Sequence, residues 1–262
     1  MSTTWITKDE LLSKRGDLSQ FLIHLTRSGI LKLDKDLYSL PKDDTRRISA
    51  KKCLEDIIFS KRIEARSAFG YFNYTVPYKR GDGTTKNANS LVRRDWLRAA
   101  CFTETPLEHI PLLTQKVYGR NQQFENYGLA FKEKVIRNRQ GNPVFYTDTR
   151  NSALRAAYDS IVTTAAASQF KSFMPLVEGF GAPWFQKFGA PSEIDFRWER
   201  EWRVCGDFSF SVSDIAFGIC PTGEVSCFEN LLSGLVPFVD PTSSLSAIKQ
   251  KLKSFSHLSN LK

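Results

Sequence analysis

Hydrophobic and polar residues alternate along several short stretches of the chain, a pattern typical of half-buried β-strands. The clearest early example is the stretch from Leu18 to Arg27, which predicts a strand with Leu22, His24 and Thr26 on one face. Apolar runs bounded by turn residues predict further strands at 99–103, 127–131, 142–146 and 212–220. Residues 78–89 are polar and glycine-containing, and they predict a loop.

Apolar residues at three-to-four spacing predict helices between these strands. The longest helical pattern runs from Ser49 to Phe69, and alanine-rich residues 151–167 predict a second helix. Thr7 and Glu10 have the spacing of a capping box, and shorter helices are predicted at 107–117, 221–231 and 243–258. Strands and helices without regular βαβ alternation predict an α+β fold. We treat residues 1–262 as a single domain.

The stretch from Asp195 to Asp207 carries the most unusual pattern of charge. Read as a strand, residues 198–204 place Glu199, Glu201 and Arg203 on one face. Two carboxylates this close either raise one pKa or are held by a cation or a ligand. The structural alternative is an edge strand with a solvated ladder of charges. A glycine-, proline- and aromatic-rich segment at 180–191 predicts a loop that leads into this strand and could select an acceptor.

Charge and composition favour a polyanionic partner without proving one. The net charge is +9, and each neutralised phosphate of a nucleic acid releases counterions. Aromatic and arginine residues also gather between residues 66 and 98, where they could guide a nucleic-acid strand or pack the core. Many basic proteins do not bind nucleic acid, so the charge alone does not separate these alternatives.

Cysteine and histidine spacing argues against a metal site. The five cysteines form no CxxC pair and the three histidines are far apart, so no zinc site is predicted. The first residues are charged where a signal peptide needs an apolar core, and no apolar run approaches the roughly 20 residues of a membrane span. We therefore expect a reduced, cytoplasmic protein with no membrane partner.

Three separated pieces of the chain resemble DarT-type ADP-ribosyltransferases. His24-Leu-Thr26 resembles the H-x-T strand of that family, residues 63–66 resemble its following arginine segment, and residues 201–204 resemble the strand that begins with its catalytic glutamate. The resemblance implies an ADP-ribosyltransferase-like split mixed β-sheet core with flanking helices. It also implies that His24 and Thr26 contact NAD, that Arg66 lies near its phosphates and the reacting centre, and that Glu201 is catalytic.

Other segments resemble the AbiGi group of phage-defence proteins, over roughly residues 95–205. They are residues 101–107, 127–131, 142–146 and 199–203. One departure from the DarT pattern matters. Residues 102–105 read Phe-Thr-Glu-Thr where that family has an aromatic strand followed by Arg-Ser, so the nucleic-acid contacts made there cannot be carried over.

The chemistry of these residues agrees with the resemblance. Cleavage of the nicotinamide–ribose bond passes through an oxocarbenium-like state, which a carboxylate beside the sugar stabilises. Glu201 is the candidate for that role, and Glu199 could orient the acceptor or accept its proton. Arg66 could offset the pyrophosphate charge of NAD. Nicotinamide is itself the leaving group, so the reaction requires no metal.

The sequence thus favours an NAD-dependent ADP-ribosyltransferase toxin of phage defence that modifies RNA or single-stranded DNA and is neutralised by a cognate antitoxin. The alternative is a non-catalytic component, such as an antitoxin or sensor, that binds nucleic acid or a protein partner. A metal-free nuclease using His24 and Glu201 ranks last. The first hypothesis requires His24, Arg66 and Glu201 to converge around one dinucleotide-sized cleft.

Overall fold

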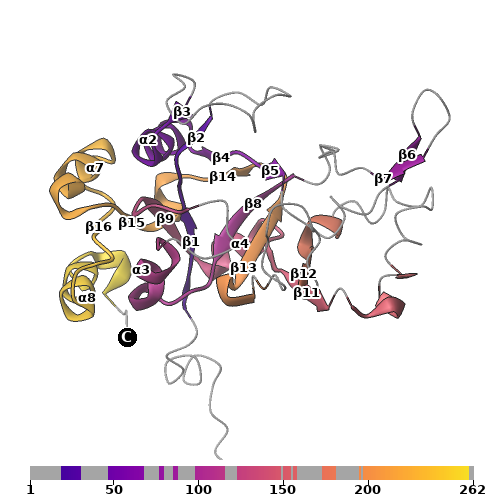
Figure 1. Cartoon of the computed structure of the whole chain (residues 1–262). Coiled ribbons are helices and arrows are strands. Elements are labelled where there is room, and N and C mark those ends of the chain that lie inside the picture. Colours follow the sequence, from indigo (N-terminus) through magenta and orange to yellow (C-terminus); the bar gives the residue numbers. More distant parts are fainter. Residues whose placement is uncertain are drawn as a thin grey trace, which may run out of the picture. The chain divides into compact units, whose positions relative to one another are not determined.

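A computed structural model describes most of the chain. The described residues are 19–30, 47–67, 77–79, 85–87, 98–115, 123–148, 150–154, 156–157, 173–180, 195 and 197–259. Their helices and short strands, with both parallel and antiparallel pairing, confirm the predicted α+β class (Figure 1). The capping box at 7–10 and almost all of the 180–191 loop lie outside the described residues.

The chain divides into two compact units, and each unit is assembled from separate stretches of sequence. Unit 1 comprises residues 1–62, 102–135 and 209–262, and unit 2 comprises residues 63–101 and 136–208. Strand β8 (Arg98–Thr103) contributes its first four residues to unit 2 and its last two to unit 1. The short strands β4 (Arg62–Ile63) and β14 (Phe208–Ser209) and the helix α4 (Glu133–Asn138) also span boundaries between the units.

Unit 1 is built on an antiparallel core of strands extended by one parallel edge. β1 (Phe21–Leu25) pairs with the end of β8 and with β9 (Gly128–Lys132), β9 pairs with β15 (Ile215–Ile219), and β15 pairs in parallel with β16 (Phe238–Val239). The close pairing of β1 and β9 requires a glycine, because a Cβ on Gly128 would lie 2.4 Å from the carbonyl oxygen of His24. The remaining elements of unit 1 are β2 (Gly29–Ile30), β3 (Arg47–Ile48), α2 (Ala50–Ser60), η4 (Leu107–His109), α3 (Ile110–Leu113), η7 (Val212–Asp214), η8 (Thr222–Glu224), α7 (Val225–Leu231), α8 (Leu245–Lys253) and η9 (Ser256–Leu258).

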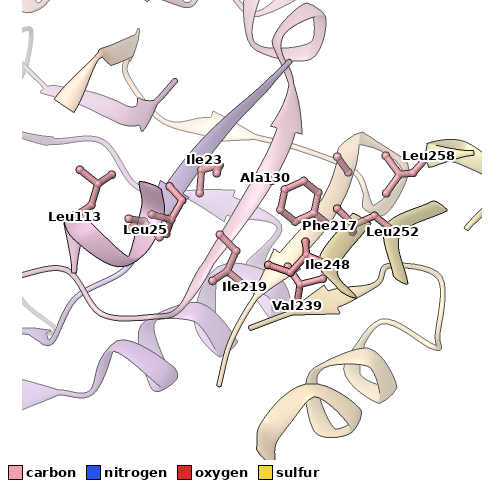
Figure 2. Close-up of a cluster of buried hydrophobic side chains, with 12 residues drawn as sticks. Ile23, Leu25, Leu113, Ala130, Phe217, Ile219, Val239, Ile248, Leu252 and Leu258 are labelled. Atoms are coloured by element: carbon pink, nitrogen blue, oxygen red, sulfur yellow. The ribbon is translucent and has the colours of Figure 1, made fainter. Parts of the chain in front are cut away.

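The hydrophobic core of unit 1 joins strands and helices that are distant in the sequence (Figure 2). Phe217 of β15 is fully buried, and its ring meets the ring of Phe21 edge-on at 5.1 Å. Ile248 and Leu252 of α8 pack against the same cluster because they lie four residues apart on one face of the helix. This core is apolar throughout.

Unit 2 contains the elements around the predicted catalytic strand. Strand β13 (Glu201–Cys205) pairs antiparallel with β10 (Asn142–Pro143), and β11 (Phe145–Asp148) pairs in parallel with β12 (Val177–Phe180). The first half of β8 pairs antiparallel with β5 (Arg66–Ser67). The other described elements of unit 2 are β6 (Pro77–Lys79), β7 (Thr85–Asn87), η5 (Met174–Leu176) and η6 (Arg197–Glu199).

Four predicted elements differ from the structure in their boundaries or their type. The helix expected over 49–69 ends at Ser60, where Lys61 adopts a left-handed φ of 52°. The strand expected over 198–204 begins only at Glu201, after the η6 turn. The loop expected over 78–89 contains the hairpin strands β6 and β7, and residues 142–146 form parts of two strands in different sheets.

The other predicted elements agree with the structure where it describes them. The strands expected at 18–27, 99–103, 127–131 and 212–220 correspond to β1, β8, β9 and β15. The helices expected at 107–117, 221–231 and 243–258 correspond to α3, α7 and α8, of which α3 and α7 are preceded, and α8 followed, by a 3-10 turn. Of the alanine-rich helix, residues 152–154 and 156–157 are helical, and residues 158–167 lie outside the described part.

Candidate functional site

Glu201 is the first residue of β13, and the backbone just before it departs from an extended strand. Arg200 has a φ of 46°, which is in the left-handed region, and Glu199 belongs to the η6 turn. Glu199 and Glu201 therefore do not share a strand face, which corrects that prediction. Glu201 and Arg203 do lie two residues apart on one strand, and their side chains meet as expected.

Arg203 forms the centre of a cluster of polar side chains in unit 2. Its Nη2 donates to Glu201 Oε2 at 2.7 Å and to Glu178 Oε2 at 2.8 Å, and its Nη1 donates to the Pro175 carbonyl oxygen at 2.6 Å. The Nε atom is buried without a hydrogen-bond partner. We call these three side chains, Glu178, Glu201 and Arg203, the carboxylate–arginine cluster.

The cluster is buried, but not to the same degree at each carboxylate. The side chains of Arg203 and Glu178 are 3% and 7% exposed, whereas that of Glu201 is 14% exposed. A charge removed from water in this way must be paired, because its desolvation costs several kcal/mol or more. One guanidinium serves both carboxylates here, and Glu201 is the more accessible of the two.

Neighbouring strands place Tyr146 and Cys101 beside the cluster. Tyr146 of β11 stands opposite Glu178 of β12, so the two side chains share one face of that parallel pair. The Tyr146 hydroxyl accepts a hydrogen bond of 3.3 Å from the Glu201 backbone N–H. The charges of both Glu201 and Arg203 act on the Cys101 thiol of β8.

Burial makes the acids around Arg203 weaker than usual. It raises the pKa of Glu178 to about 7, although Arg203 pulls that pKa downward. Burial, with the charge of Glu201, also raises the pKa values of Cys101 and Tyr146, so both groups stay protonated at neutral pH. Burial lowers the pKa of Arg203, but the charges of Glu201 and Glu178 outweigh this effect and hold it above its ordinary value.

The arrangement holds Glu201 firmly and leaves its carboxylate partly accessible. A carboxylate fixed by a guanidinium can act as a hydrogen-bond acceptor toward a sugar hydroxyl or as a stabiliser of positive charge. The same contacts also serve a purely structural purpose, because they satisfy charges in the interior of unit 2. The geometry is compatible with either use.

His24 and Thr26, the residues expected to bind NAD, belong to unit 1. The half-buried imidazole of His24 meets the ring of Phe102 edge-on at 5.9 Å. Thr26 follows β1 and is 4% exposed, and its hydroxyl donates to the carbonyl oxygens of Ala50 at 2.9 Å and Tyr127 at 3.3 Å. The Thr26 donor thus holds the start of α2 against β9, a role that the sequence did not predict.

Arg66, the third residue expected near NAD, is exposed on β5 of unit 2. It stands opposite Ala99 of β8, and Cys101 follows two residues later on the same face. Arg66 and Cys101 therefore lie on the same face of the paired strands β5 and β8. The charges of Glu201 and Arg203 act on the Cys101 thiol. The convergence of His24 with Arg66 and Glu201 stays a prediction.

Glu178 is the member of the cluster that sequence reasoning missed. It stands in the apolar run Leu176-Val177-Glu178-Gly179-Phe180, where a single carboxylate has no local partner. A lone charge inside a short apolar run was the available signal, because such a group needs a counter-ion from elsewhere in the chain. Its partner, Arg203, lies 25 residues away in sequence.

Two further searches of the described residues bear on the chemistry. In this part of the chain, no group of three or more His, Cys, Asp or Glu side chains is arranged to hold a metal ion. No described helix is long and apolar enough to cross a membrane.

Comparison with known families places the cluster in context. Residues 72–226, more than half of the chain, match the family model described as "Putative abortive phage resistance protein AbiGi, antitoxin". The chain belongs to the AbiGi family. The predicted AbiGi resemblance is therefore confirmed, over a longer stretch than expected. No curated protein and no solved structure gives a significant match.

The AbiGi match contains the whole carboxylate–arginine cluster, but it begins after His24, Thr26 and Arg66. It supports a link to abortive infection, and it does not extend to the residues on which the NAD-binding hypothesis depends. The DarT-like part of the prediction remains a prediction.

Proposed function

We propose that this protein is a non-catalytic, partner-binding component of an abortive-infection system, acting as an antitoxin. The observation that carries the proposal is the AbiGi match over residues 72–226, because the description of that family names both phage resistance and an antitoxin. An antitoxin works by binding, so its activity needs a surface and a stable fold rather than a reactive carboxylate.

The carboxylate–arginine cluster supports this function. Both of its carboxylates bind the same buried guanidinium, as expected for charges that stabilise one particular packing of strands. In this function the cluster fastens β12 to β13 through their side chains, and the partner binds elsewhere on the chain. Substitution of Glu201 by glutamine then leaves neutralisation intact as long as the chain folds.

The net charge indicates which class of partner is favoured. At +9 the chain attracts acidic surfaces at long range, and this raises the rate of encounter with an acidic protein. We therefore expect the cognate toxin to present an acidic face and the complex to weaken as ionic strength rises.

A growth assay in cells that carry the neighbouring gene of the defence locus tests the proposal. The neighbouring protein is induced alone, with the wild-type chain, or with the Glu201→Gln variant. The antitoxin function predicts that the neighbouring protein stops growth and that the wild-type and variant chains restore it equally. Glu108→Gln is a matched control, because Glu108 is an exposed glutamate of unit 1.

If expression of the chain itself stops growth, and the neighbouring protein relieves the arrest, the antitoxin proposal is wrong. A separate experiment tests charge-driven binding. The purified chain is mixed with the neighbouring protein, and size-exclusion chromatography detects their complex at low and at high salt. A complex that dissociates as salt increases agrees with charge-driven binding.

A second candidate function is the NAD-dependent ADP-ribosyltransferase, favoured by one specific observation. Glu201 opens strand β13, its carboxylate is partly exposed, and Arg203 fixes its orientation. In this function Glu201 would hydrogen-bond a ribose hydroxyl and stabilise the oxocarbenium-like state. Glu199 would assist the acceptor, His24 and Thr26 would hold NAD, and Arg66 would face its pyrophosphate.

The transfer reaction balances without a metal or an oxidant. The bond between ribose C1′ and the nicotinamide nitrogen breaks, and nicotinamide leaves with the electron pair. A nitrogen or oxygen of an RNA or single-stranded DNA base then bonds to C1′, and its proton passes to a carboxylate or to solvent.

Incubation of the purified chain with labelled NAD and, separately, RNA, single-stranded DNA or protein tests this candidate. The transferase function predicts label on one acceptor and release of nicotinamide, both lost in Glu201→Gln and retained in Glu108→Gln. Absence of label on every acceptor, with no nicotinamide released, would rule out the transferase under these conditions and leave the antitoxin function.

A further inference from the structure

The two carboxylates of the cluster compete for a single hydrogen-bonding nitrogen. Glu178 Oε2 and Glu201 Oε2 both contact Nη2 of Arg203, at 2.8 and 2.7 Å. The two oxygens are therefore no more than about 5.5 Å apart, a range in which like charges repel strongly when water is excluded. This is closer than two independent surface carboxylates would remain.

Among the residues that the structure describes, the charges around the pair do not balance when both carboxylates are ionised. Arg203 supplies one positive charge, and Glu178 and Glu201 would supply two negative charges. The other groups that face the cluster are the Cys101 thiol from β8 and the Tyr146 phenol from β11, which are neutral at ordinary pH. Glu199 of η6 adds negative charge that acts on both of these groups.

The remaining contacts do not offset the second negative charge. Glu178 Oε1 accepts one hydrogen bond of 3.3 Å from the backbone N–H of Gly179. Nη1 of Arg203 donates its hydrogen bond to the Pro175 carbonyl oxygen and not to either carboxylate. A neutral cluster therefore requires one proton in addition to the guanidinium. Two carboxylates that share a site commonly titrate as a pair in this way.

We propose that Glu178 and Glu201 together retain one proton at neutral pH, so that the cluster is a buried proton-binding site with Arg203 as its counter-ion. The proton resides mainly on Glu178, because that side chain is the more buried of the two. Glu201, which is more exposed, remains paired with Arg203. The raised pKa of Glu178 is consistent with this distribution.

This protonation site is independent of both functions proposed above. It follows from the contacts of three side chains and requires neither a toxin partner nor NAD. As pH rises past neutrality the proton is lost, and two anions then share one guanidinium. The junction between β12 and β13 is consequently weaker in alkaline solution than at mildly acidic pH.

Infrared spectroscopy of the purified full chain in heavy water tests the proposal, because a protonated carboxyl group has its own C=O stretching band. At about pH 6 most surface carboxylates are ionised, so a retained proton appears as a band equivalent to one carboxyl group per chain. We expect this band in the wild type, its loss as pH rises through about 7, and its absence in Glu178→Gln.

Glu201→Gln provides the second and more discriminating variant. With one carboxylate left, Glu178 no longer experiences the repulsion of Glu201, although burial still raises its pKa, so the band at about pH 6 is weakened. Glu108→Gln removes an exposed carboxylate and keeps the band. Far-UV circular dichroism confirms that each variant is folded.

Three results would overturn the proposal. They are a wild-type spectrum without the band at about pH 6, a band that persists unchanged in Glu178→Gln, and a band that persists unchanged in Glu201→Gln. The last result would mean that Glu178 keeps its proton without help from the second carboxylate.

Discussion

The interiors of the two units both contain buried apolar side chains, but they differ in the charge that they bury. Unit 1 packs apolar side chains from strands β1, β9 and β15 against helices α3 and α8, and its core cluster has no charged member. Unit 2 instead buries Glu178 and Arg203 beside Glu201. Apolar packing is non-directional and tolerates adjustment, whereas a buried ion cluster stabilises only the arrangement in which every charge meets its partner.

This contrast explains where substitutions should respond to pH. A cavity in an apolar core costs the same at any pH at which the protein is folded, because no titrating group is involved. A defect in the carboxylate–arginine cluster costs an amount that depends on which carboxylates are ionised.

Phe217→Ala should destabilise unit 1 most. The ring is fully buried and meets Phe21 edge-on, so its loss removes buried area and an aromatic pair. We expect a loss of about 5 kcal/mol in the free energy of unfolding, independent of pH. Urea unfolding of the wild type and of Phe217→Ala at several pH values measures the difference in the free energy of unfolding. Leu235→Ala, at a leucine that is 64% exposed, should change stability by less than about 0.5 kcal/mol.

Arg203→Met should destabilise unit 2 by about 4 kcal/mol at neutral pH, because it leaves the buried Glu178 and Glu201 side chains, and the negative charge that they retain, without a cation. Unlike the loss at Phe217, this loss should shrink in acid as the carboxylates take up protons. Arg66→Met is the matched control, since Arg66 is exposed and its replacement should have little effect. A loss at Arg203 that stays constant with pH would contradict the comparison.

Glu178→Gln should change the pH dependence of stability. The folded-state pKa of Glu178 is raised to about 7, above the ordinary 4.5, so the protonated carboxyl favours the folded state below pH 4.5. That contribution is lost as pH rises to about 7, by on the order of 3 kcal/mol. Glutamine does not titrate, so the wild type should lose stability relative to the variant across this interval. Parallel curves of unfolding free energy against pH would contradict the prediction.

Thr26→Val should have the smallest effect of the set. The substitution nearly preserves shape but removes the hydroxyl that donates to Ala50 and Tyr127, at a cost of about 1 kcal/mol. Thermal unfolding measures the change. Thr114→Val is the control, because that half-buried hydroxyl donates to the carbonyl oxygen of Pro111 within its own turn and its loss should cost less. If NAD protects the wild type from unfolding but not Thr26→Val, the transferase function gains support over the antitoxin function.

Local pattern was enough to predict the strands β1, β8, β9 and β15 and the pairing of Glu201 with Arg203. Strand periodicity placed these two residues on one face, and they meet at 2.7 Å. The same periodicity failed at Glu199, because Arg200 takes a left-handed conformation that no alternation of residues reveals. Likewise the pattern over 49–69 continues beyond Ser60, although Lys61 ends the helix there.

The third member of the cluster could not be located from local pattern at all. Glu178 reaches Arg203 only because β11, β12 and β13 bring distant segments together. A sequence shows that a buried carboxylate needs a cation, but it does not show which of the 37 lysines and arginines is folded against it. The predicted approach of His24 to Arg66 and Glu201 is a question of the same kind.

The interleaving of the two units also determines how the gene can be divided. The backbone leaves unit 1 after residue 62, returns at 102, leaves again after 135 and returns at 209. Neither half is therefore encoded by one continuous stretch of codons, and no simple truncation yields either half alone. Deletion from one end removes strands from one unit and leaves the other without part of its supporting chain. Loss of activity in such fragments therefore indicates misfolding and does not locate a functional residue. Point substitutions in the intact chain are the way to locate its working residues.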